Sequence, residues 1–155
     1  MNIKPTHANF QMPVKSTSGS GAYDLFMPQN GEYVPGHFQT LYTLGFSAEV
    51  PENHVALILP RSGVGMKANV EINNTCGVID SDYRGEWFAK IRTKNGSPWN
   101  WKAGDRLLQM LIVPVASPEL ILVDELSDTD RGAGGIGSTG MGSLDKAAAA
   151  RRDEA

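Results

Sequence analysis

The sequence of 155 residues contains only one cysteine, Cys76, so the chain cannot form an intramolecular disulfide and does not need an oxidising compartment to fold. Its net charge is only −3, which disfavours nucleic acid or another polyanion as the main binding partner. No stretch approaches the roughly 18 apolar residues that span a membrane, and residues 1–10 lack the apolar core of a signal peptide. We therefore expect a cytoplasmic protein that binds neither membrane nor nucleic acid.

Glycine and proline are abundant, with 17 and 9 residues, which is typical of a chain with many turns and few long helices. Apolar and polar residues alternate from Tyr42 to Val50, which predicts a half-buried strand. The continuous apolar runs His54–Leu59 and Leu107–Val115 predict strands covered on both faces. Shorter strands are expected at Glu86–Arg92 and Glu119–Val123. The pattern predicts an all-β fold, an antiparallel sandwich or barrel of the jelly-roll kind.

Composition divides the chain into three parts. Residues 1–127 are expected to form one β domain, because they contain all the predicted strands. Residues 128–142 are rich in glycine and cannot bury a core, so they should form a mobile arm. Residues 143–155 are rich in alanine and charge, and we expect them to be disordered or a frayed helix without an assigned function.

Polar residues with possible phosphate chemistry lie beside two of the predicted strands. Asp24 lies between apolar residues near the start of a strand, where an aspartate alone is more often a turn or capping residue. Arg61, Ser62 and Gly63 directly follow the strand that ends at Leu59. A guanidinium, a hydroxyl and a glycine amide at a strand end can bind an oxyanion, although a plain turn is also compatible with this sequence.

The segment Asn73–Glu86 has the highest density of polar groups. Asp80 and Asp82 flank a serine at what we interpret as the bend of a β-hairpin, whose open backbone edge could pair with a flat heterocycle. Asp80 could act as a general base if it lies within hydrogen-bond reach of a water. The alternative is a structural hairpin turn with a core tyrosine, Tyr83.

One polar residue, Gln109, interrupts the apolar run Leu107–Val115 and needs a buried partner. A structural hydrogen bond and a ligand contact are both compatible with this position. We interpret the preceding pair, Asp105–Arg106, as a local ion pair.

The arm contains a glycine-rich stretch, Asp130–Gly140. Gly132–Gly137 satisfies the G-x-G-x-x-G pattern, but no helix is expected after it, so the pattern does not indicate a dinucleotide-binding fold. Exposed amides, two hydroxyls and Arg131 are instead suited to wrapping a polyphosphate.

In order and spacing these motifs resemble the five motifs of the trimeric dUTP diphosphatases, across Gly21–Gly140. The matches that carry the resemblance are Pro60–Gly63, Gly77–Gly85, Gly104–Arg106 with Gln109, and Arg131–Gly140. It implies a distorted jelly-roll (β-clip) subunit with a flexible C-terminal arm, and a homotrimer whose three active sites each use all three chains. It also implies Mg²⁺-dependent hydrolysis of dUTP to dUMP and pyrophosphate, which limits uracil incorporation into DNA and supplies dUMP for thymidylate synthesis.

The resemblance also implies roles for individual residues. The side chain of Asn74 and the backbone around Gly77 and Ile79 would read uracil, and Tyr83 would pack under the deoxyribose. Asp80 would deprotonate the attacking water, and Asp24 would hold Mg²⁺ through a water shell. The phosphate-positioning residues would be Arg61, Ser62, Gly63 and Gln109. In the arm, Arg131 would close over the phosphates, and the other substrate-binding residues would be Gly135, Ile136, Gly137, Ser138 and Thr139.

Two departures from the family pattern and three alternatives remain. Ile136 stands where the family usually has an aromatic residue, and the order Gly21–Ala22 replaces the usual Ala-Gly. A dCTP deaminase on the same fold would need a glutamate, for which Glu86 is available. A catalytically silent nucleotide-binding protein is the second alternative. The third is a sugar-binding jelly roll using Trp99 and Trp101, which we interpret as core or interface residues.

Overall fold

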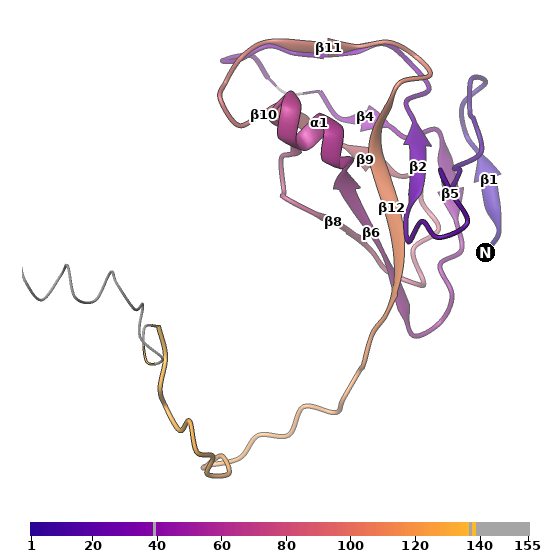
Figure 1. Ribbon diagram of the computed structural model, residues 1–155. Helices are drawn as coiled ribbons and strands as arrows, with labels where there is room; N and C mark the ends of the chain where they lie inside the picture. Colours follow the sequence, from indigo (N-terminus) through magenta and orange to yellow (C-terminus); the bar gives the residue numbers. More distant parts are fainter. Residues whose placement is uncertain (39, 137, 139–155) are drawn as a thin grey trace, which may run out of the picture. The chain divides into compact units, whose positions relative to one another are not determined.

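The computed structural model describes residues 1–38, 40–136 and 138. The chain divides into two units, Met1–Pro118 and Glu119–Ala155, and each is considered by itself. Among the described residues, all strands and the short helix belong to the first unit (Figure 1). They are β1 (Ile3–Pro5), β2 (Tyr23–Phe26), β3 (Gly31–Tyr33), β4 (Tyr42–Thr43), β5 (Phe46–Ala48), β6 (His54–Pro60), α1 (Ser62–Lys67), β7 (Val70–Ile72), β8 (Gly77–Ile79), β9 (Phe88–Ala89), β10 (Ile91–Thr93), β11 (Trp99–Trp101) and β12 (Arg106–Pro114). This content confirms the all-β prediction.

The largest sheet has the strand order β2-β12-β6-β8. The two predicted apolar runs form its centre, where β12 and β6 lie side by side (Figure 1). They pair antiparallel, with Met110 opposite Ile58 and Gln109 opposite Leu59. On the other side of β12, β2 places Asp24 opposite Gln109. Four further sheets contain two strands each, in the pairs β1-β5, β10-β7, β11-β3 and β4-β9.

The two faces of the large sheet differ in burial. Its inner face belongs to the hydrophobic core, with Ala56 and Leu108 0% exposed and Ile58 and Met110 1–2% exposed. On the outer face, the apolar residues of β6 and β12 are only half-buried and are Val55, Leu57, Leu59, Leu111 and Val113, and the polar Gln109 lies on the same face. The prediction that both runs are covered on two faces is therefore wrong for the single chain, because the outer-face residues of β6 and β12 remain only half-buried.

The alternating stretch Tyr42–Val50 buries one side in the core, as predicted: Tyr42, Leu44, Phe46, Ala48 and Val50 are all buried. It forms two strands rather than one, because Gly45 between them adopts a φ of +83° that ends the extended conformation. As a result β4 pairs with β9 and β5 pairs with β1.

The core is rich in aromatic contacts. Phe46 packs on Trp87 with ring centroids 4.9 Å apart, and Tyr42 meets Trp101 edge-to-face at 4.6 Å. Trp101 is 3% exposed and Trp99 packs against it at 5.7 Å, which confirms their interpretation as core residues. A sugar-binding platform built on these two tryptophans is therefore not supported.

Two further expectations need correction, and one element was not expected. Glu86–Arg92 forms two strands, β9 and β10, with different partners. Glu119–Val123 is not a strand, because it has no pairing partner among the described residues. The sequence also gave no sign of α1, a helix of under two turns without a side-chain cap. In the described part of the chain, no helix has the length and apolar character needed to cross a membrane.

Candidate active site

A groove of about 460 Å³ lies over the outer face of the large sheet. It brings together four of the predicted phosphate and metal residues, Asp24, Arg61, Ser62 and Gln109, from separate parts of the chain. The pairing of β2, β12 and β6 explains the meeting, because Asp24, Gln109 and Leu59 occupy one row across the sheet. We call this cavity the phosphate groove.

Asp24 is the electrostatic centre of the phosphate groove. The residue is only 6% exposed, and its Oδ1 accepts a hydrogen bond from Arg61 Nε at 2.8 Å. Its Oδ2 accepts bonds from Arg106 Nη1 at 3.1 Å and from Ser16 Oγ at 3.2 Å. One carboxylate thus holds two guanidinium groups, which leaves a net positive charge suited to phosphate.

Arg106 and Ser16 were not among the predicted site residues. The interpretation of Asp105–Arg106 as a local ion pair is wrong, since Arg106 pairs with Asp24 and Asp105 Oδ2 instead accepts the Lys102 N–H at 2.8 Å in the turn before β12. Successive residues of a strand point to opposite faces, so Arg106 pairs with Asp24 on the neighbouring strand and not with Asp105. The only sequence signal for Ser16 was the serine- and glycine-rich stretch before Asp24.

Arg61 connects β6 to α1 and is fixed at several atoms. Its backbone N–H donates to Leu107 O at 2.9 Å, and its Nη1 donates to Arg106 O at 3.1 Å. Ser62 and Gly63 follow it in the exposed first turn of α1. Their hydroxyl and amide groups are therefore available to a ligand beside the guanidinium.

Gln109 makes the structural hydrogen bond that its position was expected to need. Its Nε2 donates to Pro60 O at 3.0 Å, which is a structural bond between β12 and the end of β6. The half-buried side chain also lines the phosphate groove. The bond holds the amide in one orientation, so the group is pre-organised for a contact in the groove.

A second cavity, of about 180 Å³, lies between β8 and β9 and is lined in part by Asn74, Gly77, Ile58 and Phe88. We call it the base pocket. β8 is the last strand of its sheet, so the backbone groups on its outer side have no ladder partner among the described residues. A Cβ added to Gly77 would lie 3.2 Å from Ile58 Cβ, so glycine keeps this strand close to β6.

The base pocket exists because the chain after β8 does not pair back on it. The interpretation of Asn73–Glu86 as a hairpin is therefore wrong: Asp80–Tyr83 forms a turn with a Tyr83 N–H to Asp80 O bond of 3.2 Å, but β9 then pairs with β4. Trp87 explains why the chain leaves β8. Its side chain is buried in the core, with the residue 1% exposed, and its backbone N–H donates to Phe46 O at 3.0 Å.

The turn exposes the predicted catalytic and sugar-binding side chains. Asp80 is exposed, and Tyr83 is 43% exposed, so Tyr83 is not a core residue. The Tyr83 hydroxyl donates to Glu86 O at 3.1 Å. Ile79 is half-buried at the end of β8, directly before Asp80.

Glu86 turns its carboxylate toward the N-terminal strands. Oε1 accepts hydrogen bonds from the hydroxyls of Thr43 and Thr6, the latter at 2.6 Å. These bonds, from Thr43 first and then Thr6, lower the pKa of Glu86 below its ordinary value because they favour the charged form. A carboxylate committed in this way does not suit the deaminase alternative, which needs it at the base.

The phosphate groove and the base pocket use opposite faces of one strand. Leu59 lines the phosphate groove, whereas Ile58 lines the base pocket. Successive residues of a strand point to opposite faces. Within one chain, the two predicted halves of the site are therefore separated by the sheet.

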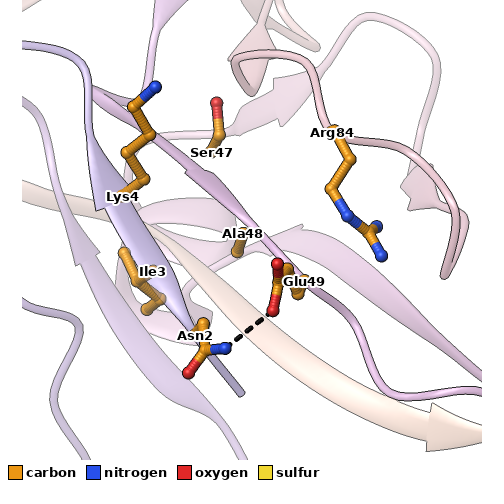
Figure 2. A pocket seen from close by; sticks show the side chains of 7 residues that line it. All are labelled: Asn2, Ile3, Lys4, Ser47, Ala48, Glu49 and Arg84. Carbon is orange, nitrogen blue, oxygen red and sulfur yellow. Dashed lines mark hydrogen bonds between the residues drawn. The ribbon is translucent and has the colours of Figure 1, made fainter.

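A third cavity, of about 260 Å³, contains none of the predicted site residues. Figure 2 shows it between the β1–β5 pair and Arg84, with the Asn2 Nδ2 to Glu49 Oε2 hydrogen bond of 2.7 Å at one side. Arg84 Nη1 donates to Ser81 O at 2.7 Å, so this side chain braces the turn after β8. In the parts of the chain that the structure describes, no three His, Cys, Asp or Glu side chains form a potential metal cluster.

The glycine-rich arm belongs to the second unit. Arg131 Nε donates to Gly134 O at 2.9 Å, and Ser138 N–H donates to Gly135 O at 3.2 Å. Ile136 is fully exposed. The predicted substrate-binding residues Gly137 and Thr139 lie outside the described residues.

Comparisons with known proteins show which family this chain belongs to. The sequence model of the dUTPase family matches residues 8–140. A deoxyuridine 5'-triphosphate nucleotidohydrolase from a Hydrogenobaculum species is 37% identical over 139 residues, which cover 90% of this chain and 96% of the relative. Its counterpart from Shewanella pealeana is 39% identical over 134 residues, or 84% and 88% of the two chains.

Solved structures agree as well. The dUTPase of Staphylococcus bacteriophage 80alpha, determined with dUpNHpp, superimposes with a TM-score of 0.81 at 25% identity, covering 90% of this chain and 98% of that one. The fold of a dUTPase from phage phi11 of S. aureus, described with a structural Mg(II) ion, is also similar, with a TM-score of 0.71 at 24% identity and coverage of 80% and 96%. These likenesses confirm the jelly-roll-like fold. The chain belongs to the dUTPase family and is an enzyme of the dUTP diphosphatase class.

Proposed function

We propose that the protein splits dUTP into dUMP and pyrophosphate by attack of a water on the α-phosphorus, with Asp80 as the general base. The observation that carries the proposal is the phosphate groove, where Asp24, Arg61, Ser62 and Gln109 come together from distant parts of the sequence. Phosphoryl substitution is mostly positioning and charge neutralisation, which is what such a set of side chains provides.

The phosphate groove would bind the triphosphate. Arg61 donates its Nε–H to Asp24 and one Nη1–H to Arg106 O, so the second Nη1–H and both Nη2–H groups can donate to phosphate oxygens. The Ser62 hydroxyl, the Gly63 amide and the Gln109 amide would add hydrogen bonds. Because Asp24 and Pro60 already fix these groups, little order has to be created when substrate binds.

The base pocket would select uracil and deoxyribose. The open backbone edge of Gly77 and Ile79 offers both donors and acceptors, and the Asn74 amide can complete the match to the edge of uracil. A mismatched base would leave these groups unpaired, which gives selectivity. Tyr83, rigid against Glu86 O, would lie under the sugar where a 2′-hydroxyl would clash.

Asp80 and the arm would complete the chemistry. Asp80 lies on an exposed turn, where its carboxylate can accept a proton from water and hand it to the leaving pyrophosphate or to solvent. We propose residues 128–142 as the arm, with Arg131 closing over the phosphates and Gly135, Ile136, Gly137, Ser138 and Thr139 covering the substrate. Such closure excludes bulk water late in binding. We assign no role to residues 143–155.

Mg²⁺ suits this groove as a companion of the triphosphate rather than as a resident ion. A carboxylate has about four acceptor positions, and those of Asp24 already hold Arg61, Arg106 and Ser16. The remaining position fits one water of a hydrated Mg²⁺, which agrees with an indirect role for Asp24. When bound, the ion would neutralise phosphate charge and polarise the phosphorus.

We further propose a homotrimer with shared active sites. The base pocket and the phosphate groove of one chain are separated by its own sheet, so one nucleotide needs a groove and a pocket from two copies. The half-buried apolar outer face offers a surface for a neighbouring copy. Leu120, Ile121, Leu122 and Leu126 in the second unit are at least 73% exposed and would also be buried in an assembly.

In the cell, this reaction would limit uracil incorporation into DNA and supply dUMP for thymidylate synthesis.

The test of the proposed function is pyrophosphate release from dUTP, UTP, dTTP and dCTP in the presence of Mg²⁺, for the wild type and for Asp80→Asn. We expect turnover of dUTP alone, and loss of most of that rate in Asp80→Asn with dUTP binding retained. A wild type that binds dUTP without releasing pyrophosphate would favour the catalytically silent alternative.

A further inference from the structure

Glu86 joins three parts of the molecule that are distant in sequence. Its Oε1 accepts hydrogen bonds from Thr6 Oγ1, directly after β1, and from Thr43 Oγ1 in β4. Thr43 Oγ1 in turn accepts the Gly45 N–H at 2.8 Å, and the Thr6 N–H donates to Gly45 O at 2.9 Å. The carboxylate is thus part of a closed network, which restricts its position more than a single surface bond would.

The backbone of the same residue supports Tyr83. The Tyr83 hydroxyl donates to Glu86 O at 3.1 Å, and the ring lies directly against Gly85. A Cβ at Gly85 would be 2.4 Å from the Tyr83 hydroxyl, so the ring could not lie there above any other residue. Tyr83 therefore rests on a short backbone segment, 85–86, whose position depends on what holds Glu86.

We infer that Glu86 is a positioning residue for sugar selection: its carboxylate, held by Thr6 and Thr43, fixes the backbone on which Tyr83 rests. This inference rests on the proposed role of Tyr83 under the deoxyribose. A ring that excludes a 2′-hydroxyl must stay within a fraction of an ångström of its place. If segment 85–86 becomes more mobile, the ring can move away from a 2′-hydroxyl, so kcat/KM for UTP rises relative to kcat/KM for dUTP.

The geometry also predicts which substitutions preserve the function. Glutamine keeps an oxygen that can accept both threonine hydroxyls, whereas alanine removes the acceptor. Thr6→Val removes one donor at an exposed strand end and leaves residues 80–86 unchanged. A comparison of the three variants therefore shows whether selectivity depends on the hydrogen bonds that residue 86 accepts or only on the length of its side chain.

The experiment measures kcat and KM for dUTP and UTP with the full chain and Mg²⁺. For Glu86→Ala we expect KM for dUTP to rise about tenfold and the dUTP-to-UTP ratio of kcat/KM to fall about tenfold, the loss expected for hydrogen bonds to a charged group. Glu86→Gln should stay within about twofold of the wild-type ratio, and Thr6→Val should lower it about threefold.

Glu49→Ala is the matched control. Glu49 also binds the N-terminal strand region, through Asn2 Nδ2 at 2.7 Å, but has no hydrogen bond to residues 80–86 among the described bonds (Figure 2). It should keep the wild-type ratio. The inference is overturned if Glu86→Ala lowers kcat equally for both nucleotides at an unchanged ratio. If Glu86→Ala does not fold, an unchanged ratio in Thr6→Val overturns it. A wild type without dUTP turnover would instead contradict the proposed function.

Discussion

The phosphate groove and the base pocket lie on opposite faces of one sheet and are built by different physical means. The groove depends on charge: a nearly buried aspartate holds two arginines in place before any ligand arrives. The base pocket lies beside an unpaired strand edge and is lined by apolar side chains together with Asn73, Asn74 and Lys90, of which we propose Asn74 for base recognition. We therefore expect the groove to supply affinity for the phosphates, and the pocket to supply selectivity for the base.

Arg61→Ala should have the largest effect on the groove. It removes a proposed phosphate contact and one of two guanidinium partners of Asp24, so we expect kcat/KM for dUTP to fall by about 10³ and the free energy of unfolding to fall by about 1.5 kcal/mol. The dUTP-to-dCTP ratio should not change, because the pocket is intact. Pyrophosphate release and thermal denaturation measure the two effects.

Arg92→Ala provides the control for this prediction. Arg92 also forms an ion pair, with Glu71 at 2.7 Å, but it does not line the phosphate groove. Its loss should leave kcat/KM within about twofold, as expected for a partly exposed pair. Equal losses of activity in both variants would show that Arg61 acts only through stability.

Asn74→Ala should affect the pocket and not the groove. It leaves one polar edge of the base unpaired, so we expect the dUTP-to-dCTP ratio of kcat/KM to fall about thirtyfold. Competition by pyrophosphate or inorganic triphosphate should not change. Asn73→Ala, at the neighbouring pocket residue, is the control, and a similar loss there would remove the case for a specific contact.

Ile136→Phe should have the smallest effect. The side chain is fully exposed and carries no ring, so a phenylalanine would add stacking on the base when the arm closes. We expect KM for dUTP to fall about fourfold with kcat unchanged. Ile136→Leu, which adds no ring, should behave as the wild type, and an unchanged KM in both variants would mean that this residue does not cover uracil.

Local patterns in the sequence were sufficient for much of the fold. The alternation from Tyr42 to Val50 predicted the buried side chains correctly, because burial follows the period of the strand. The break at Gly45 was not foreseen, since a positive φ is one of several conformations that glycine allows. Glu119–Val123 has the composition of a strand, but a strand also needs a partner, and composition does not say whether one is present.

The site required more than local patterns. The motif order led to Asp24, Arg61, Ser62 and Gln109, and the structure places them in one groove. Arg106 was misassigned because its partner is 82 residues away, and a sequence shows only the neighbour, Asp105. The two hydroxyls on Glu86 are 80 and 43 residues distant, so no spacing rule could have connected them.

The division of the site between two faces is tested most directly by mixing two inactive variants. Asp80→Asn damages the pocket side and Arg61→Ala damages the groove side, and the two proteins are unfolded together and refolded. If each site combines the groove of one copy with the pocket of another, about one quarter of the sites in a randomly mixed trimer are intact and dUTP hydrolysis returns to about that fraction. Refolded mixtures that remain as inactive as either variant alone would place the whole site within one chain and contradict this account.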